Sequence, residues 1–291
     1  MARVSSRTGW WRSGKVRRLA MGLTTLLGGK QQGFFIPHRH ADRVAPSGYP
    51  ALDARFAARA KAFLDLLAEI EAWVPHLLTM KGPAPTPRFD QDWFPRLDAA
   101  AAYTIVRRAK PHRIVEVGSG HSTRFLARAI LDGDLKTSLV CIDPAPRASL
   151  EGLAVDWLPL LLQDAPGTCF AALRPGDLLF IDSSHVLMPG SDVDRLLNQI
   201  LPLLAPGVIL HVHDIFLPDP YPEDWAWRGY NEQSAVAAML QGEAYELLFA
   251  SHYLVSRHGE RLSGGALAAL PRRSSAFESS LWLQKRATRP S

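Results

Sequence analysis

Hydrophobic and polar positions follow two different rhythms along this chain of 291 residues. Between residues 52 and 78, apolar side chains recur every three or four positions, which predicts an amphipathic helix. The apolar stripe of that helix consists of Phe56, Ala60, Phe63, Leu67 and Ile70. A second helical stretch covers residues 99–109 and ends before Pro111, because proline disfavours helical geometry in the residue before it. We therefore expect helices to precede the rest of the fold.

After Pro111, short apolar runs alternate with helical patterns. The expected strands lie at residues 113–117, 138–142, 155–162, 177–181 and 207–212, with two late strands at 246–250 and 280–284. Helices are expected at residues 122–131 and 192–204 and again after Asn231. Short apolar strands separated by helices are typical of a parallel sheet that is covered on both faces. The pattern therefore predicts an α/β fold with a doubly wound, mostly parallel, seven-stranded sheet and an N-terminal helical extension.

Composition excludes two classes of protein. Hydrophobic residues make up 47% of the chain and charged residues 21%, which is too apolar for a disordered chain. The clean apolar runs are only a few residues long, whereas a membrane-spanning helix needs about 18 consecutive apolar residues. We therefore expect a sizeable hydrophobic core in a chain that does not span a membrane.

The formal net charge of +5 is concentrated near the N-terminus. Residues 1–41 carry eight basic side chains and no acid, whereas the remaining 250 residues carry 25 basic and 28 acidic side chains. A slightly acidic body lacks the basic surface that nucleic-acid binding requires. No nucleic-acid partner is therefore expected.

Residues 1–48 are interpreted as a basic, flexible arm, because runs of like charge usually stay solvated. The alternative is an interfacial helix that contacts an anionic membrane surface or an acidic partner. Its apolar side would consist of Trp10, Trp11, Leu19, Leu23 and Leu26. Residues 49–97 are expected to form a helical extension or cap, and residues 98–291 the main domain.

Two features favour a cytoplasmic location. The stretch over residues 19–27 superficially resembles a signal peptide, but glycine and threonine interrupt it and no small-x-small cleavage site follows. The two cysteines, Cys141 and Cys169, are too few for a disulfide framework and lack the spacing of metal ligands. Both observations fit a reducing compartment. Nothing in the sequence indicates an oligomeric state.

A glycine-rich turn follows the expected strand at residues 113–117. Gly118 and Gly120 allow sharp backbone torsions and close approach of a ligand, and the helix that follows offers free N–H groups. Such a turn predicts a nucleotide-like cofactor. Thr123 replaces the third glycine of the dinucleotide fingerprint, and Glu116 stands where its charge would repel a pyrophosphate. Both departures weigh against a nicotinamide-dependent oxidoreductase, which stays as an alternative.

The segment Glu116-x-Gly118-x-Gly120-x-Ser122 resembles the first motif of the class I S-adenosylmethionine-dependent methyltransferases. The resemblance covers about residues 98–291 and implies a Rossmann-like fold. It also implies that both glycines pass under the methionine portion of S-adenosylmethionine and that Glu116 helps to organise its amino group.

Two further acids complete this expected cofactor site. Asp143 closes the second strand, where its carboxylate could accept hydrogen bonds from both ribose hydroxyls. Asp164 follows the third strand, where the family commonly contacts the adenine amine. For Asp164, a solvated loop acid is an equally good interpretation.

A second group of polar residues follows the fourth and fifth strands. Asp182 begins an Asp-Ser-Ser-His segment, and Asp214 ends a His-x-His-Asp segment. Both lie at strand carboxyl ends, where open α/β sheets bind ligands. The two segments resemble a bacterial subgroup of the same methyltransferases.

Methyl transfer to a hydroxyl requires that the proton of the acceptor be removed or polarised, by a base or by a divalent ion. The resemblance to O-methyltransferases implies Mg²⁺ at Asp182 and Asp214, although His213 and Ile215 replace the usual third ligand beside the second acid. The histidines offer another chemistry. His185, His211 and His213 could act as bases, could bind a softer metal such as zinc with Asp214, or could simply brace loops.

Four aromatic residues follow the fifth strand and are interpreted as a lid or wall over the acceptor, or as a packed loop without substrate contact: Tyr221, Trp225, Trp227 and Tyr230. The complete hypothesis is an S-adenosylmethionine-dependent methyltransferase that methylates an oxygen of a small molecule, with a nitrogen as the alternative acceptor. His185, His213 and Asp214 are its candidate catalytic residues. A non-catalytic, methyltransferase-like binding subunit is the second alternative.

Overall fold

The computed structural model describes residues 14–30, 32, 39–40, 43 and 45–287. The chain divides into two compact units. One consists of Met1–Ser47 together with Pro220–Tyr230, and the other of Gly48–Asp219 together with Asn231–Ser291. We call them the arm unit and the sheet unit and describe each by itself.

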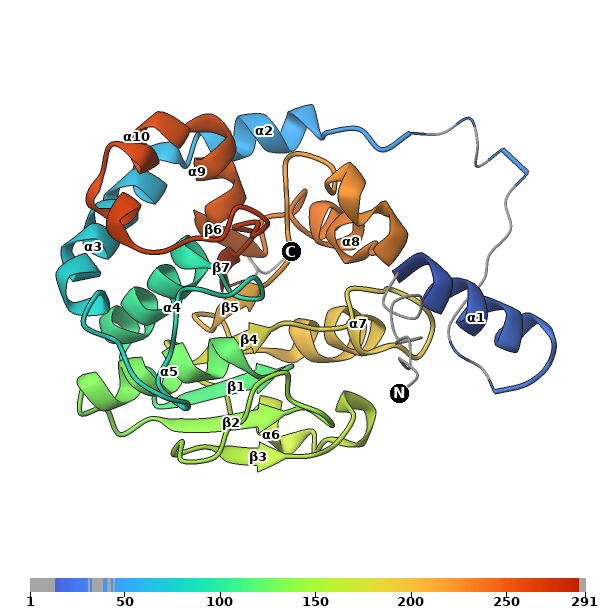
Figure 1. Cartoon of the computed structure of the whole chain (residues 1–291), viewed down its shortest axis with the longest axis horizontal. Helices are drawn as coiled ribbons and strands as arrows, with labels where there is room; N and C mark the ends of the chain where they lie inside the picture. The colour runs from blue at the N-terminus through green and yellow to red at the C-terminus, as the bar shows by residue number, and fades with distance from the viewer. Residues whose placement is uncertain (1–13, 31, 33–38, 41–42, 44, 288–291) are drawn as a thin grey trace, which may run out of the picture. The chain divides into compact units, whose positions relative to one another are not determined.

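Seven strands within the described residues form one sheet, in the order β3-β2-β1-β4-β5-β7-β6 (Figure 1). They are β1 (Arg113–Val117), β2 (Ser138–Ile142), β3 (Asp156–Leu158), β4 (Leu178–Ile181), β5 (Ile209–Val212), β6 (Tyr245–Ala250) and β7 (Leu281–Lys285). The first five are parallel, and β7 runs antiparallel to both of its neighbours. The predicted seven-stranded, mostly parallel sheet is confirmed, although β3 is shorter than expected.

The order of the strands reverses at β1. Strand β1 pairs with β2 on one side and with β4 on the other, and the register aligns Val117 with Ile142 and with Ile181. Helices that follow strands on the two sides of such a point diverge, which leaves a crevice beyond the carboxyl ends of the strands. The glycine turn after β1 and Asp182 after β4 therefore meet at this crevice.

The helices depart from the sequence prediction at several places. The single helix expected over residues 52–78 is two helices, α2 (Pro50–Ala57) and α3 (Ala60–Leu77). At their junction, Arg59 donates to the backbone oxygen of Leu247 at 3.0 Å and pairs with Glu246 at 2.8 Å. The junction is thus attached to β6.

Two further differences are in the second half of the chain. The helix expected over residues 192–204 consists of α7 (Asp192–Arg195), a π-helical turn (Leu196–Ile200) and a 3₁₀ turn (Leu201–Leu203). Pro202 lies in that last turn and lacks the N–H that a continuing α-helix needs. Two short helices between β6 and β7, α9 (Ser251–Arg257) and α10 (Gly259–Ser263), are not predicted by the sequence pattern.

The remaining helices of the sheet unit are α4 (Arg96–Ala109), α5 (His121–Asp132), α6 (Thr168–Ala171) and α8 (Glu232–Met239). Helices α4 and α5 lie side by side against the sheet, and α3 packs on α4 and β6 (Figure 1). Helix α4 ends at Ala109, and the following Lys110 adopts a left-handed conformation before Pro111.

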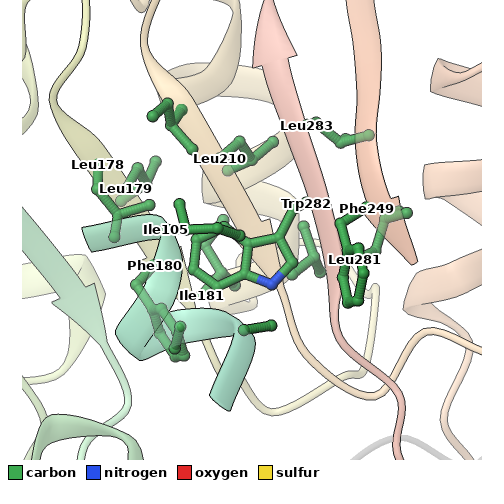
Figure 2. Packing of buried hydrophobic residues seen from close by; sticks show 14 of the residues in the cluster. Ile105, Leu178, Leu179, Phe180, Ile181, Leu210, Phe249, Leu281, Trp282 and Leu283 are labelled. Carbon is green, nitrogen blue, oxygen red and sulfur yellow. The ribbon is translucent and has the colours of Figure 1, made fainter. Parts of the chain in front are cut away.

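The core of the sheet unit is centred on Trp282 of β7. Figure 2 shows its indole ring among Phe180 of β4, Leu210 of β5, Phe249 of β6 and Ile105 of α4, all buried. The same cluster includes residues of α2 and α3, and the rings of Phe63 and Phe249 meet edge to face at 6.3 Å. Residues 50–77 and the sheet therefore share one hydrophobic core.

The arm unit contains helix α1 (Gly14–Leu26) and a 3₁₀ turn (Glu223–Arg228). Arg18 of α1 donates hydrogen bonds to the backbone oxygens of Ala226 and Trp227 in that turn. Trp10 and Trp11, which belong to the expected interfacial helix, lie outside the described residues. Across the described ranges, every helix is too short or too polar to pass through a bilayer.

Candidate active site

Gly118 lies at the end of β1, in a position that excludes any side chain. Its φ angle is +79°, in the left-handed region, and a Cβ atom there would lie 1.9 Å from the backbone oxygen of Asp182. A side chain would therefore push the ends of β1 and β4 apart. The close approach leaves bare backbone at the floor of the crevice.

Thr123 ties the glycine turn to the start of α5. Its hydroxyl oxygen accepts a hydrogen bond from the backbone N–H of Gly120 at 2.9 Å and donates to Glu116 Oε2 at 2.6 Å. Ser122 donates to Glu116 Oε1, also at 2.6 Å. A threonine in place of the third fingerprint glycine thus has a specific task, which is to connect Gly120 with Glu116.

Glu116 is fully buried behind the turn. Burial raises the pKa of its carboxyl group to about 7, although hydrogen bonds from Ser122, Thr123 and Cys141 act in the opposite direction. Both carboxyl oxygens are engaged by helix α5, and Glu116 is not among the residues that line the crevice. The structure therefore gives Glu116 a place in holding the turn together.

A cleft of about 540 Å³ opens beside the turn. This volume is within the range of small-molecule sites. Its lining comes from the ends of β1, β2 and β4 and from the loops after β3 and β4, and it includes Gly118, Asp143, Leu162, Gln163, Asp182 and Ser184. The predicted residues Gly118 and Asp143 therefore meet at one cleft.

Asp143 stands at the end of β2 with both carboxylate oxygens facing backbone N–H groups. Oδ2 accepts from Ser119 at 2.6 Å, and Oδ1 accepts from Ala145 at 2.7 Å. Each oxygen keeps a second lone pair that can accept a ribose hydroxyl. Asp164, in contrast, is exposed and is absent from the lining of the cleft, to which its neighbour Gln163 contributes.

Asp182, His185 and Asp214 converge at the carboxyl ends of β4 and β5. His185 Nε2 lies 3.3 Å from Asp182 Oδ1 and 3.4 Å from Asp214 Oδ2. Its other ring nitrogen, Nδ1, lies 2.8 Å from Glu232 Oε2 at the start of α8. His185 and Asp214 both adopt left-handed φ angles, of 61° and 55°. Such backbone strain in residues other than glycine is concentrated at functional sites.

His213 joins the same cluster from β5. Its Nδ1 atom lies 3.5 Å from an oxygen of Asp182 and 3.5 Å from an oxygen of Asp214, and its Nε2 atom lies 3.4 Å from Asp98 Oδ2. Asp98 is fully buried in the first turn of α4 and accepts hydrogen bonds from the backbone N–H groups of Ser279 and Ser280, at 2.9 and 3.0 Å. The structure thus gathers four carboxylates around two histidines. We call Asp98, Asp182, Asp214, Glu232, His185 and His213 the acid–histidine cluster.

The cluster favours charged histidines. Burial acts to lower the pKa of His185, but its hydrogen bonds to Asp182 and Glu232 and the charge of Asp214 outweigh burial, so the pKa is raised well above its ordinary value. The same balance, with Asp214 and Asp182, raises the pKa of His213. Burial also opposes ionisation of Asp182, yet the two histidines hold its pKa well below the usual range. Asp182 is therefore a carboxylate at neutral pH.

A small recess of about 10 Å³ lies on the other side of the glycine turn, with room for about one water-sized group. Two of its lining residues have a buried polar atom without a hydrogen-bond partner in the described part of the chain, Ser119 Oγ and His121 Nδ1. Burial, and then the charges of Arg124 and Arg88, lower the pKa of His121 to about 4. The recess therefore offers neutral hydrogen-bonding groups.

Asp182 and Arg147 line both the cleft and the recess. The side chain of Asp182 is 29% exposed, whereas those of His185, His213 and Asp214 are 3%, 4% and 11% exposed. Among the described residues of the acid–histidine cluster, Asp182 alone lines the cleft and the recess. The predicted catalytic residues His185, His213 and Asp214 thus come together, but they contact Asp182 and do not themselves line the cleft or the recess.

His211 lies apart from this chemistry. It is fully buried, its ring stacks on Phe180 with centroids 3.7 Å apart, and burial holds its pKa well below the ordinary value. Its ring also lies nearly parallel to that of His213 at 5.9 Å, as two positions on the same side of a strand allow. His211 is therefore a neutral residue of the core.

The cluster fits magnesium poorly. Asp182, His185 and Asp214 can each place one ligand atom within 4.8 Å of the others. Mg²⁺ prefers oxygen ligands, whereas the third donor here is an imidazole nitrogen, and a mixed set of imidazole and carboxylate suits divalent transition metals instead.

Sequence reasoning missed four contributors to the site: Asp98, Glu232 as a partner of His185, Trp93 and Arg147. Trp93 lines the recess, and the guanidinium carbon of Arg147 lies 4.2 Å from the centre of its ring. An acid in the first turn of a helix, as Asp98 and Glu232 are, is ordinarily explained by the helix dipole. Only contacts between distant parts of the chain distinguish these two acids from ordinary helix starts.

The four aromatic residues predicted as a lid lie in the arm unit. Tyr221 and Trp225 each meet Tyr230 edge to face, at 6.0 and 5.9 Å, and the guanidinium carbon of Arg228 lies 4.2 Å from the centre of the Trp225 ring. Tyr221, Trp225 and Tyr230 therefore form a packed aromatic group, whereas Trp227 is exposed. Their role as a lid stays a prediction.

Part of the chain matches a known protein family. Residues 115–215 match a family described as a methyltransferase domain, and this range contains the glycine turn, Asp143, Asp182 and Asp214. The match confirms the resemblance to class I S-adenosylmethionine-dependent methyltransferases, and the sheet has the architecture that this resemblance implies. S-adenosylmethionine is accordingly the methyl donor of the class. The match gives the nicotinamide alternative no support.

Solved structures with similar features are also methyltransferases. A methyltransferase of Podospora anserina bound to S-adenosylhomocysteine is 19% identical, with 88% of this chain and 100% of that chain covered and a TM-score of 0.40. The O-methyltransferase TomG of Streptomyces achromogenes, involved in tomaymycin synthesis, is 18% identical over 81% of this chain and 96% of that chain, with a TM-score of 0.38. No curated protein sequence matches this chain.

Proposed function

We propose that this protein transfers a methyl group from S-adenosylmethionine to a hydroxyl oxygen of a small molecule. The observation that carries this proposal is the position of Asp182, which lines both the cleft and the recess. A methyl donor in the cleft and an acceptor hydroxyl at the recess would then meet at one carboxylate. A displacement reaction depends on such alignment of donor and acceptor.

The cleft supplies the binding groups for the cofactor. Gly118 offers a backbone surface that a side chain would fill, and Asp143 presents carboxylate lone pairs at the end of β2. When bound, S-adenosylmethionine supplies an electrophilic methyl group on a sulfonium. Asp143 is the candidate ribose ligand, and Gln163 is a better placed candidate than Asp164 for contacts with the base, because Gln163 lines the cleft.

Asp182 would accept the hydrogen bond of the acceptor hydroxyl and orient its lone pair towards the methyl group. As the new C–O bond forms and the C–S bond breaks, the acceptor oxygen becomes strongly acidic. Even a carboxylate with a low pKa can then take up the proton. Because the side chain of Asp182 is partly exposed to the cleft, the proton can leave to solvent.

His185 and His213 act in this mechanism through Asp182, as positioning residues. Both are buried, and both hold Asp182 in its charged form. Glu232 fixes the ring of His185 from the other side, and Asp98 does so for His213. Asp214 contacts both histidines and completes the acid–histidine cluster.

Asp182→Asn separates catalysis from cofactor binding. The amide keeps the shape of the side chain but cannot take up a proton, so we expect S-adenosylhomocysteine to bind with unchanged affinity in calorimetry while methylated product falls at least about 100-fold. Product is measured as metabolites one methylene heavier in cells with wild-type protein than in deletion cells. Asp156→Asn, at an exposed position of β3, is the matched control.

Unchanged methylated products in the Asp182→Asn variant would overturn the catalytic role of this carboxylate. If no metabolite differs between wild-type and deletion cells while S-adenosylhomocysteine still binds, the alternative of a non-catalytic binding subunit is favoured. Absence of S-adenosylhomocysteine binding to folded wild-type protein would contradict the cofactor assignment itself.

A further inference from the structure

Helix α1 carries a row of exposed leucines. Leu19, Leu23 and Leu26 are 64%, 48% and 57% exposed, and Leu27, directly after the helix, is 82% exposed. Their spacing of four, three and one places them on one side of a helix that turns once every 3.6 residues. Exposed apolar side chains scattered singly are ordinary, but a contiguous group indicates an interaction surface.

The opposite side of α1 is already occupied. Arg18 donates to the backbone oxygens of Ala226 and Trp227, and Met21 and Thr25 are half-buried on the same side of the helix. Thr25 also accepts a hydrogen bond from the backbone N–H of Gln32 at 2.9 Å. Contacts inside the arm unit thus use the side of α1 opposite the leucine row and leave the leucines exposed.

Every charged residue of α1 is basic. Arg17 is exposed on the side of the helix away from the leucines, Lys30 is exposed shortly after the helix, and the first 41 residues contain no acid. The exposed acids of the arm unit, Glu223 and Asp224, belong to the turn that Arg18 contacts on the other side of α1. A basic apolar helix is complementary to an anionic bilayer surface, where leucines enter the acyl boundary and cations meet lipid phosphates. With 13 residues, α1 is about 20 Å long and can lie in that surface without spanning it.

We propose that the leucine row of α1 docks on an anionic lipid bilayer and holds the enzyme at the membrane surface. The lipid headgroups pair with the basic side chains, and the four leucines supply the apolar contact. A protein partner or a second copy of the chain would bury the same row, and the experiment below separates these occupants from lipid. The proposal is independent of the methyl-transfer chemistry.

Sedimentation of the full-length protein with vesicles tests the proposal. We expect binding to phosphatidylcholine vesicles that contain phosphatidylglycerol, little binding to phosphatidylcholine alone, and weakening by salt, because exposed charges are screened. The double variant L23E/L27E should lose at least about tenfold in partition, since it places acids in the apolar contact. Leu203→Glu is the matched control, because Leu203 is 84% exposed in the sheet unit.

Failure of the wild-type protein to sediment with phosphatidylglycerol vesicles would overturn the proposal. Equal losses in L23E/L27E and Leu203→Glu would also overturn it, because binding would then not depend on α1. If L23E/L27E leaves vesicle binding intact and changes only the oligomeric state in gel filtration, the row contacts a second copy and the lipid proposal is wrong. Unchanged S-adenosylhomocysteine affinity verifies that the variants are folded.

Discussion

Glu116 illustrates how one residue can belong to a cofactor motif without lining the cofactor cleft. Its two carboxyl oxygens accept hydrogen bonds from Ser122 and Thr123, and no part of it is exposed. The acid at this motif position therefore holds the first turn of α5 against the end of β1. Its influence on a ligand is exerted through the shape of the turn.

The raised pKa of Glu116 predicts a pH-dependent loss of stability. The folded protein keeps a proton on Glu116 up to a pH of about 7, whereas the ordinary pKa is 4.5, so the folded state binds more protons between these values. The free energy of unfolding should then fall by up to about 3 kcal/mol as pH rises from 4.5 to 7. Above pH 7 it should stay at the lower value.

Glu116→Gln should remove this contribution, because an amide does not titrate in the range. Urea unfolding of both proteins at pH 5 and at pH 8 measures the effect. We expect the variant to gain about 2–3 kcal/mol relative to wild type between these two pH values. Parallel pH profiles of the two proteins would show that Glu116 is ionised when folded.

Gly118→Ala should damage cofactor binding more than any other small substitution in the turn. The new Cβ would lie 1.9 Å from the backbone oxygen of Asp182, and the φ angle of +79° is unfavourable for alanine. We expect S-adenosylhomocysteine affinity in calorimetry to fall at least about tenfold, or 1.4 kcal/mol. Gly167→Ala is the control, because nothing lies within 4 Å of a Cβ atom at that position. Equal affinities in both variants would contradict the close approach.

The positions of the acids after β4 and β5 could be predicted from sequence, because strand ends are marked by the end of an apolar run. The environment of each histidine could not. His211 and His213 are two positions apart on β5, yet one stacks on Phe180 and the other is surrounded by carboxylates. The difference comes from the adjacent Asp214 together with Asp182 and Asp98. The last two are distant in the sequence, and spacing along one strand carries no information about them.

At the scale of elements, α4 depends on a buried ion pair at its first residue. Arg96 Nε lies 2.9 Å from Glu278 Oε1, and the same oxygen accepts from the backbone N–H of Leu97 at 2.8 Å. Glu278 thereby caps the start of α4 and joins it to the segment before β7. That helix also presents Asp98 to His213.

Arg96→Ala should destabilise the protein by about 3–5 kcal/mol, because it leaves the carboxylate of Glu278 buried without its charged partner. Arg108→Ala on the same helix is the control. Its pair with Glu69 is exposed on both sides, so its loss should cost below about 1 kcal/mol. Urea unfolding followed by circular dichroism measures both, and similar costs would contradict the role of burial.

Elements with continuous apolar runs are those that the sequence predicted best. The predicted bounds of β1 and β2 agree with the structure, and β4, whose four residues are all buried, starts one residue late. The junction of α2 and α3 could not be predicted, since the apolar stripe continues through it. It is determined by Arg59, which contacts Leu247 and Glu246 almost 190 positions later in the sequence.

At the scale of the whole molecule, residues 14–47 and the sheet unit have separate sources of stability. The hydrophobic core consists of residues from Leu52 onward and includes none of the described residues of the arm unit. The association of the arm with residues 220–230 could not be predicted from sequence, because it rests on hydrogen bonds between Arg18 and backbone atoms about 200 positions away.

Removal of residues 1–47 should therefore change the free energy of unfolding of the remaining chain by less than about 1 kcal/mol. Removal of residues 1–59 is the contrasting deletion, since it also takes away the fully buried side chains of Leu52 and Phe56. That deletion should cost more than about 4 kcal/mol. Thermal unfolding of both proteins checks the prediction, and a large loss with the shorter deletion would show that the arm contributes to the core.

The contact between Gly118 and Asp182 fixes the spacing of two backbone segments beside the cleft. The peptide planes of two neighbouring strands touch at this point, with no rotatable side-chain bond between them, and a hydrogen bond of 2.8 Å from Asp182 N–H to Val117 O joins them again. The spacing between the backbone of Gly118 and the Cα atom of Asp182 is therefore governed by main-chain geometry. Substitutions in the side-chain walls of the cleft should accordingly leave this contact between the two strand ends in place.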